Sequence, residues 1–150
     1  MKIGVFNRHG KVVAVATVDD DMSEFVRSYN WRLDHGYVYA ADGHCGRVWL
    51  HKLVLGIDDS QVDHINGNPL DCRRQNLRPC TQAQNNQNVS NKGGCSQYRG
   101  VTWEAKKRLW RAHARLNGKR IWLGRFKDEA EAARAALEFR RAHMPFAVER

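Results

Sequence analysis

The stretch from residue 62 to residue 88 combines metal-ligand, imidazole and arginine side chains at unusual density. Asp63 and His64 stand side by side before an Asn-Gly-Asn-Pro run, and Asn85 follows further along the chain. Carboxylate and amide oxygens are hard donors that suit Mg²⁺ with several waters retained, and a neutral imidazole can take a proton near pH 7. Each fragment by itself is more typical of a surface pair or a plain turn, so their combination is what predicts a site.

Two short strands and a helix must position these side chains. Val62 and Ile65 anchor the first strand, the Asn-Gly-Asn-Pro run forces a turn or loop, and residues 76–78 return as the second strand. Thr81 is a reasonable N-cap for a helix over about residues 82–88, which would project the amide ligand from its first turns.

Four motifs in this region carry a family resemblance: His51-Lys-Leu-Val-Leu-Gly, Asp63-His64-Ile-Asn-Gly-Asn-Pro-Leu, Arg73-Arg74-Gln-Asn76-Leu-Arg78 and Thr81-Gln-Ala-Gln-Asn85-Asn86. Over residues 51–88 the chain resembles the HNH homing endonucleases, the ββα-metal nucleases of phage genomes and mobile introns. The resemblance implies that His64 is the general base, Asp63 a metal ligand and Asn76 the residue that orders the catalytic loop. It implies Asn85 as the second ligand, with the neighbouring Asn86 as the alternative.

The implied reaction is hydrolysis of a phosphodiester, which needs a deprotonated water in line with the leaving 3′ oxygen and a cation to absorb developing charge. The expected cofactor is a divalent metal, Mg²⁺ with Mn²⁺ as the alternative. Zinc is not expected, because the four cysteines form no C-x-x-C pair and free thiols in a reducing cytosol are the default. A structural zinc site is the minor alternative.

Four residues within these motifs have no single interpretation. Arg73, Arg74 and Arg78 could contact phosphate or serve as solvated or structural arginines. His51 could pack beneath the site or touch DNA, and its role stays unassigned.

Positive charge is concentrated in the C-terminal third of the chain. The net charge is +9, yet residues 1–95 carry 11 basic and 10 acidic side chains, whereas residues 96–150 carry 14 and 6. Residues 96–127 hold ten Lys or Arg and a single acid, Glu104. Such a patch points to a polyanionic partner.

Strand alternation divides this basic segment into two faces. Between residues 110 and 116 the even positions are apolar and the odd ones are polar, and a strong Asn-Gly hairpin signal follows. A third strand is expected over residues 98–103, and Asp128 opens a helix with a stripe of small residues that can lie close on the sheet. We therefore expect a three-stranded antiparallel sheet packed on one helix, whose outer face carries Arg111, His113, Arg115, Arg120 and Trp122.

Residues 96–143 resemble the plant ethylene-response-factor (APETALA-type) DNA-binding domain, through Tyr98-Arg-Gly-Val101, Trp110-Arg-Ala112, Gly118-Lys-Arg-Ile-Trp-Leu-Gly124, Phe126 and Glu129-Ala-Glu-Ala-Ala133. The resemblance implies that the sheet enters the major groove, with matching contact positions at Arg99, Arg115, Arg120 and Trp122. His113, Glu104 and Lys106 depart from the plant pattern, so base preference does not transfer. A core position for Trp122 and a solvated hairpin tip at 106–108 are the alternatives.

In the first sixty residues the sequence predicts secondary structure but no catalytic or binding site. Apolar runs at 2–7 and 11–18 read as a hairpin, a helix over about 19–29 buries one stripe, and segments 37–40 and 47–50 form a second hairpin. The longest apolar run there has seven positions, far short of the roughly 18 that a membrane span needs, and no secretory signal peptide is expected.

Together these features predict an α+β DNA endonuclease with three parts: an HNH nuclease domain at 1–90 with its motif core at 51–88, a linker at 91–95 and an APETALA-type domain at 96–150. Double-stranded DNA is the expected partner, with no membrane and no obligate protein partner. A cytoplasmic protein of phage or mobile-element type is expected. The alternatives are a non-catalytic DNA-binding regulator that keeps the nuclease fold, and an RNA-binding protein.

Overall fold

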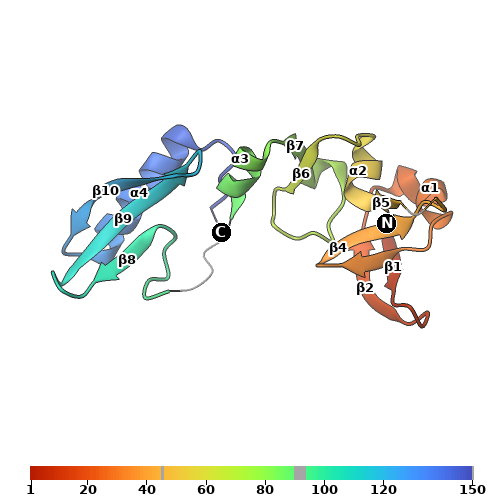
Figure 1. The fold of residues 1–150 in the computed structure, drawn as a ribbon, viewed down its shortest axis with the longest axis horizontal. Coiled ribbons are helices and arrows are strands. Elements are labelled where there is room, and N and C mark those ends of the chain that lie inside the picture. The colour runs from red at the N-terminus through yellow and green to blue at the C-terminus, as the bar shows by residue number, and fades with distance from the viewer. Residues whose placement is uncertain (45, 90–93, 150) are drawn as a thin grey trace. The chain divides into compact units, whose positions relative to one another are not determined.

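The computed structural model describes residues 1–44, 46–89 and 94–149, and it has the predicted mixed α+β character, with several sheets and few helices. The chain forms two compact units, Met1–Cys80 and Thr81–Arg150 (Figure 1). Residues 91–93 of the predicted linker lie outside the described residues, so the domain boundary at 91–95 stays a prediction.

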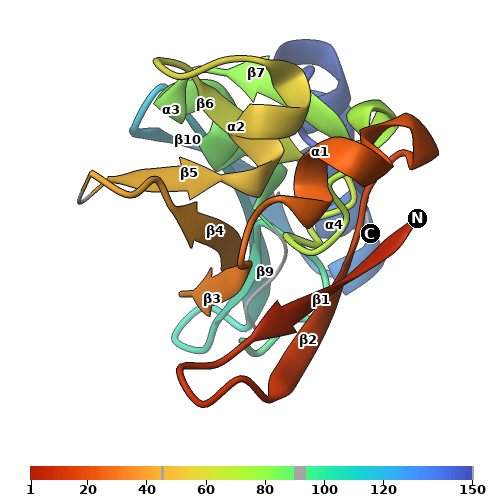
Figure 2. The same cartoon turned by 90° about the vertical axis from the view of Figure 1, so that its right-hand side faces the viewer.

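The first unit is built on a five-stranded sheet with strand order β2-β1-β3-β4-β5, followed by a separate two-stranded hairpin (Figure 2). Its elements are β1 (Lys2–Phe6), β2 (Val12–Thr17), the 3₁₀ turn η1 (Asp20–Met22), α1 (Ser23–Arg27), β3 (Arg32–Asp34), β4 (Tyr37–Ala41), β5 (Arg47–Trp49), α2 (Leu50–Leu55), β6 (Gln61–His64), η2 (Arg74–Asn76) and β7 (Leu77–Cys80).

Apolar side chains from the sheet, α1 and α2 form the core of this unit. Val5, Val38, Leu50 and Cys72 are among its fully buried members. Cys72 comes from the loop between β6 and β7, so the same core that holds the sheet together also fixes the segment that carries the candidate site.

Two predicted hairpins are confirmed, because β1 pairs with β2 and β4 pairs with β5, both antiparallel. The sequence did not predict β3, which has only three residues yet joins the two hairpins by pairing parallel to β1 and antiparallel to β4. In the predicted helical stripe, Val26 is buried but Phe25 is exposed, because the α-helical part spans only five residues and presents a narrow face to the core.

The second unit contains a three-stranded antiparallel sheet with strand order β10-β9-β8 and one longer helix. Its elements are α3 (Gln82–Asn85), η3 (Asn86–Asn88), β8 (Val101–Glu104), β9 (Leu109–Leu116), β10 (Lys119–Phe126) and α4 (Glu129–His143). The buried core of this unit consists of small residues from both layers, which lets the helix approach the strands closely: Val101, Ala112, Ala132 and Ala136.

Both predicted helix starts in this unit have their side-chain caps. Asp128 accepts hydrogen bonds from the backbone N–H groups of Ala130 and Glu131, and Thr81 forms a complete capping box with Gln84. Within the described parts of the chain, no helix is long and apolar enough to cross a membrane.

Strand β8, which the sequence predicted to begin at residue 98, begins at Val101 instead. Gly100 explains the difference. Gly100 has a φ of +82°, outside the strand region, and its carbonyl accepts a hydrogen bond from the backbone N–H of His113 at 2.8 Å. A Cβ at this position would overlap the carbonyl oxygen of His113. The position therefore needs glycine for both its conformation and its close backbone approach.

We predict that Gly100→Ala destabilises the second unit more than Gly118→Ala does. Gly118 has a similar φ of +77° but open space around its missing side chain. The left-handed conformation costs an alanine about 1–2 kcal/mol at either position, and the backbone overlap at Gly100 adds about 1–3 kcal/mol. Urea unfolding of both variants measures the difference, and equal losses would contradict the close approach.

Candidate functional site

Asp63 and His64 are the last two residues of β6, the first strand of the β6–β7 hairpin, and this end of the strand is buried. Asp63 pairs in register with Arg78, and His64 pairs with Leu77. The side chains are buried, with Asp63 3% and His64 5% exposed. The Nε of Arg78 donates to Oδ2 of Asp63 at 2.8 Å, so the buried carboxylate has a cationic partner.

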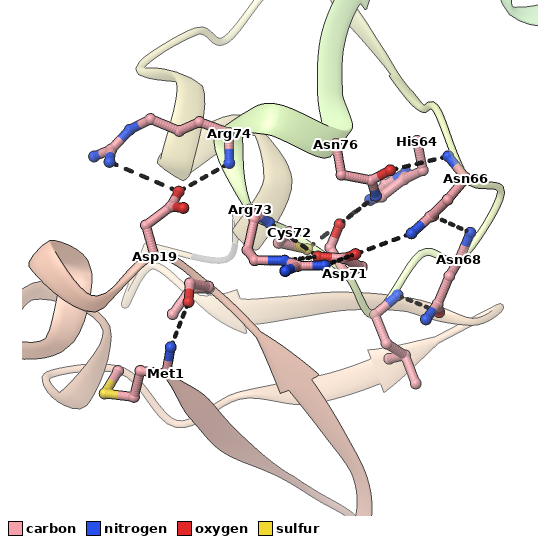
Figure 3. Close-up of polar contacts among 12 residues, drawn as sticks. Met1, Asp19, His64, Asn66, Asn68, Asp71, Cys72, Arg73, Arg74 and Asn76 are labelled. Atoms are coloured by element: carbon pink, nitrogen blue, oxygen red, sulfur yellow. Dashed lines mark hydrogen bonds and ion pairs between the residues drawn. The ribbon is translucent and has the colours of Figure 1, made fainter.

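The loop that leaves β6 is fastened by the side chain of Asn76, which is itself buried. Its Nδ2 donates to the carbonyl of Asp71 at 2.7 Å, and its Oδ1 accepts from the backbone N–H of Asn66 at 2.9 Å. The Asn76 carbonyl also accepts from the N–H of Ile65 at 2.8 Å. One amide thus ties both arms of the loop together (Figure 3).

Asp71 forms the second fastening point within this loop. Nε and Nη2 of Arg73 donate to its carboxylate, at 2.7 and 2.6 Å, and the Asn66 amide donates at 2.9 Å. The hydrogen bonds from Arg73 hold the pKa of Asp71 below its usual value. The Asp71 carboxylate therefore links Asn66 and Arg73 on the two arms of the loop.

Residues 17–21 of the first unit hold this loop from outside. The Thr17 N–H donates to the Leu70 carbonyl and the Cys72 N–H donates to the Thr17 carbonyl, both at 2.8 Å. The backbone N–H of Arg74 donates to Asp19, and its guanidinium bonds Asp21 (Figure 3 shows the contact with Asp19). The N-terminal strands, to which the sequence assigned no chemistry, thus serve as the support of the candidate site.

The three arginines that the sequence left open all have carboxylate partners in the structure: Asp71 for Arg73, Asp19 and Asp21 for Arg74, and Asp63 for Arg78. These contacts give each of them a structural role.

The imidazole of His64 lies among rings and a thiol. The His51 ring meets it edge-on at 5.3 Å between centroids, the Tyr37 ring lies at 5.9 Å, and the Cys72 Sγ is 3.9 Å from its Nε2. Burial lowers the pKa of His64, against the opposing charges of Asp63 and Asp71. A neutral imidazole at neutral pH is able to accept a proton.

His51 and Cys72 add apolar character around this imidazole. Burial, assisted by the charges of His64 and Lys52, lowers the pKa of His51 to about 4. Burial also raises the pKa of the Cys72 thiol to about 12. Both groups are therefore uncharged near pH 7, and both contact the His64 ring.

In the first unit, Asp63 offers carboxylate oxygens. In the second unit, taken by itself, the amide side chain of Asn85 in α3 is half-buried. The amide oxygen of the neighbouring Asn86 accepts from Gln82 Nε2 at 3.0 Å. In the described residues, no group of three or more His, Cys, Asp and Glu side chains gathers in a metal-binding arrangement. The carboxylate and amide donors fit a hard cation that keeps most of its waters rather than zinc.

In the second unit, one face of the sheet gathers the predicted basic and aromatic residues. Arg120 pairs with Arg115 and Trp122 pairs with His113, so these side chains share the face of Arg111. Trp122 is 51% exposed, which excludes the alternative of a core tryptophan. The structure thus brings five of the six predicted contact residues onto one surface, which we call the outer face.

Arg99 does not belong to this outer face. It lies in the loop before β8, is half-buried, and its Nη2 donates to the carbonyl of Gln87 at 2.8 Å. The carbonyl of Arg99 in turn accepts from the buried guanidinium of Arg140. Its observed contacts fasten the loop to η3 and α4.

A bulge adds a residue that strict alternation did not predict. The register shifts between Trp122 and Gly124, and this shift places Arg125 opposite Arg111. Glu104 of β8 accepts a hydrogen bond from Arg125 at 2.7 Å and lies 3.6 Å from Arg111. The hydrogen bond from Arg125 and the surrounding cations lower the pKa of Glu104.

The ring of Trp122 completes this arrangement. The guanidinium of Arg111 lies 3.9 Å from the ring centroid and that of Arg120 lies 5.4 Å from it. A hollow of about 240 Å³ opens between Arg111, Trp122, Gly124 and Arg125. The outer face therefore presents cations that stacking and an acidic neighbour hold in fixed positions.

Comparison with known families gives two matches that together cover most of the chain. The family model described as HNH endonuclease matches residues 31–87, and the AP2 domain model matches residues 96–143. These matches confirm the resemblances drawn from the motifs. They support a DNA nuclease with a DNA-binding domain as the class of protein.

A curated protein also matches part of the chain. The chain is 34% identical over 59 residues to Protein 3.8 of Escherichia phage T7, which corresponds to 39% of this chain and 49% of that protein. The chain thus spans about half the length of the curated relative it matches. No solved structure matches it.

We predict that Asn76→Ala loosens the loop of the candidate site. The variant leaves the carbonyl of buried Asp71 without its partner, at a cost of about 1–3 kcal/mol. It also removes the acceptor of the Asn66 N–H, which belongs to an exposed residue and can bond water instead. Hydrogen exchange of the Ile65 and Cys72 amides reports on this unit separately. The exposed neighbour variant Gln75→Ala should change protection by less than about 0.5 kcal/mol, and equal protection in both variants would contradict the role of the amide.

Proposed function

We propose that the protein is a metal-dependent DNA endonuclease of the HNH homing type, in which His64 activates the attacking water. The observation that carries the proposal is the environment of His64: a buried imidazole with a lowered pKa, beside Asp63, on a loop fastened by Asn76. This arrangement lies inside the segment that matches the HNH endonuclease model.

His64 acts as the general base in this proposal. A neutral imidazole takes a proton from the water that attacks phosphorus, and the 3′ oxygen leaves on the opposite side. Asn76 does not touch the reacting atoms in this scheme, and it acts by keeping the loop after β6 in one conformation.

Asp63 and Asn85 would hold the divalent cation, through one carboxylate and one amide oxygen. Asn85 is preferred to Asn86 because the Asn86 oxygen is engaged with Gln82. When bound, Mg²⁺ or Mn²⁺ supplies the positive charge that absorbs negative charge developing on the phosphate and the leaving group. Asp63 contributes charge as well as an oxygen, so its loss should weaken metal activation more than the loss of Asn85.

The outer face of the second unit is proposed to bind double-stranded DNA and to direct the nuclease to its target. Its arginines can hold phosphates or read guanine edges in the major groove. Stacking on Trp122 and pairing with Glu104 fix the guanidinium groups before DNA arrives, which reduces the conformational freedom lost on binding.

We expect His64→Ala to reduce cleavage of supercoiled plasmid by at least 100-fold while DNA affinity stays nearly unchanged, since general bases contribute about 10²–10⁴-fold. The exposed histidine variant His9→Ala serves as the matched control and should cut like the wild type. Addition of EDTA should stop cleavage by both the wild type and the control. Undiminished cleavage by His64→Ala would rule out the assignment of the base, and binding without cleavage by the wild type would favour a regulator.

We further expect Arg115→Ala and Arg125→Ala each to lower the slope of log affinity against log salt by about 0.9 if the side chain contacts phosphate. Arg134→Ala removes the same charge from the exposed surface of α4 and should leave the slope unchanged. Binding isotherms on a short duplex at several salt concentrations give the slopes. Wild-type slopes in both variants, with wild-type discrimination between sequences, would argue against contact by the outer face.

A further inference from the structure

One face of the first unit's sheet carries a row of arginine and aromatic side chains. Strands β3, β4 and β5 are antiparallel neighbours, with Tyr39 paired to Arg32 on one side and to Trp49 on the other. The opposite face holds Val38 and Ala40, which are buried in the core. Because residues two apart on a strand share a face, six side chains form what we call the arginine–aromatic face: Arg32, Asp34, Tyr37, Tyr39, Arg47 and Trp49.

Arg47 is held in place on this face while half of it stays open to solvent. Its guanidinium lies 4.6 Å from the ring centroid of Tyr39 and 5.8 Å from that of Trp49. It also donates to the carboxylate of Asp34, and its side chain is 49% exposed. A guanidinium has five N–H donors, so Asp34 leaves donors that can bind a second anion.

The arginine–aromatic face runs directly to His64. The Trp49 ring stacks on the His51 ring at 6.1 Å, and the His51 ring meets His64 at 5.3 Å. Tyr37 is 41% exposed, and its ring lies 5.9 Å from that of His64. An unbroken series of ring contacts therefore connects the exposed guanidinium of Arg47 with the imidazole proposed to activate water.

We propose that the arginine–aromatic face binds the sugar-phosphate backbone of the DNA strand whose phosphodiester is attacked by the water that His64 activates. The proposal rests on the proposed function in one respect, namely that the substrate at His64 is a DNA phosphodiester. DNA fits the face because its two arginines outnumber the single carboxylate of Asp34, and because a prepositioned guanidinium suits the two oxygens of a phosphate. Exposed Tyr37 offers a flat surface against which a sugar can pack.

The face also differs in charge from the unit that carries it. Residues 1–95 have nearly balanced charge overall, so the stacked arginine beside His64 is a local feature rather than part of a general positive field. A backbone contact here would hold the strand at the reacting centre, whereas the outer face of the second unit would supply general affinity.

The test compares Arg47→Gln with Arg27→Gln in the full chain. Arg27 is exposed at the end of α1, and its variant removes the same charge away from the face. We expect Arg47→Gln to lower the salt slope of DNA binding by about 0.9 and to weaken affinity roughly fivefold to tenfold near 0.1 M salt. In cleavage it should raise KM and leave kcat within about twofold, as expected for loss of uniform binding. Arg27→Gln should match the wild type.

A second variant keeps the test decisive if Arg47→Gln fails to fold. Arg32 is exposed on β3 within the same face, and Arg32→Gln should lower the slope in the same direction. Circular dichroism checks the fold of each variant. Wild-type slope and affinity in both face variants would overturn the inference, even if the protein cleaves DNA normally. A lowered slope in a protein that never cleaves DNA would support the contact and contradict the proposed nuclease activity.

Sedimentation of the same proteins tests whether a second copy of this chain, rather than DNA, binds to the arginine–aromatic face. If the wild type were a dimer that Arg47→Gln converts to a monomer, with an unchanged DNA salt slope, the face would be a subunit interface. That result would also overturn the inference.

Discussion

The candidate site depends first on the buried amide of Asn76. The loop between β6 and β7 is mostly polar, with Leu70 and Cys72 joining the apolar core. Two hydrogen bonds from the Asn76 side chain add to that anchoring, because they satisfy backbone groups on both arms of the loop. Their energetic importance comes mainly from the bond to the carbonyl of buried Asp71, which would remain unsatisfied if the amide were lost.

Burial also determines the chemistry available to His64. Removal from water favours the uncharged imidazole, and the pKa of His64 falls even though Asp63 and Asp71 oppose the change. Asp63 is kept inside by Arg78, and Asp71 by Arg73 and Asn66. Charged groups are therefore present close to His64, but each has a specific partner that limits its effect. The same packing that stabilises the unit thus prepares the histidine to accept a proton.

The two units present arginines in the same physical way. In the first, Arg47 stacks on Tyr39 and contacts Asp34. In the second, Arg111 stacks on Trp122 and lies beside Glu104. In each case a ring and a carboxylate fix the guanidinium without burying it. Fixed cations of this kind suit a regular array of phosphates better than flexible lysines would.

Much of this structure could be predicted from short-range patterns in the sequence. The turn residues after His64 and the apolar anchors Val62 and Ile65 predicted the β6–β7 hairpin, and Thr81 and Asp128 predicted the helix starts. Alternation of polar and apolar residues predicted the outer face. These features could be read because each depends on residues only a few positions apart. The motifs likewise identified the two families, since they are short and ordered along the chain.

Only the tertiary structure could show which distant residues support the site. The anchoring of the loop by Thr17 and Asp19 and the contact of His51 with His64 join segments that have no local relationship in the sequence. The bulge before Gly124 brought Arg125 onto the outer face, because one extra residue breaks the period of two on which alternation relies. Arg99 matched a contact position by its motif, yet its guanidinium bonds the Gln87 carbonyl instead of joining the outer face. Sequence patterns determine local conformation, whereas the direction and partner of a side chain depend on packing between segments far apart in the chain.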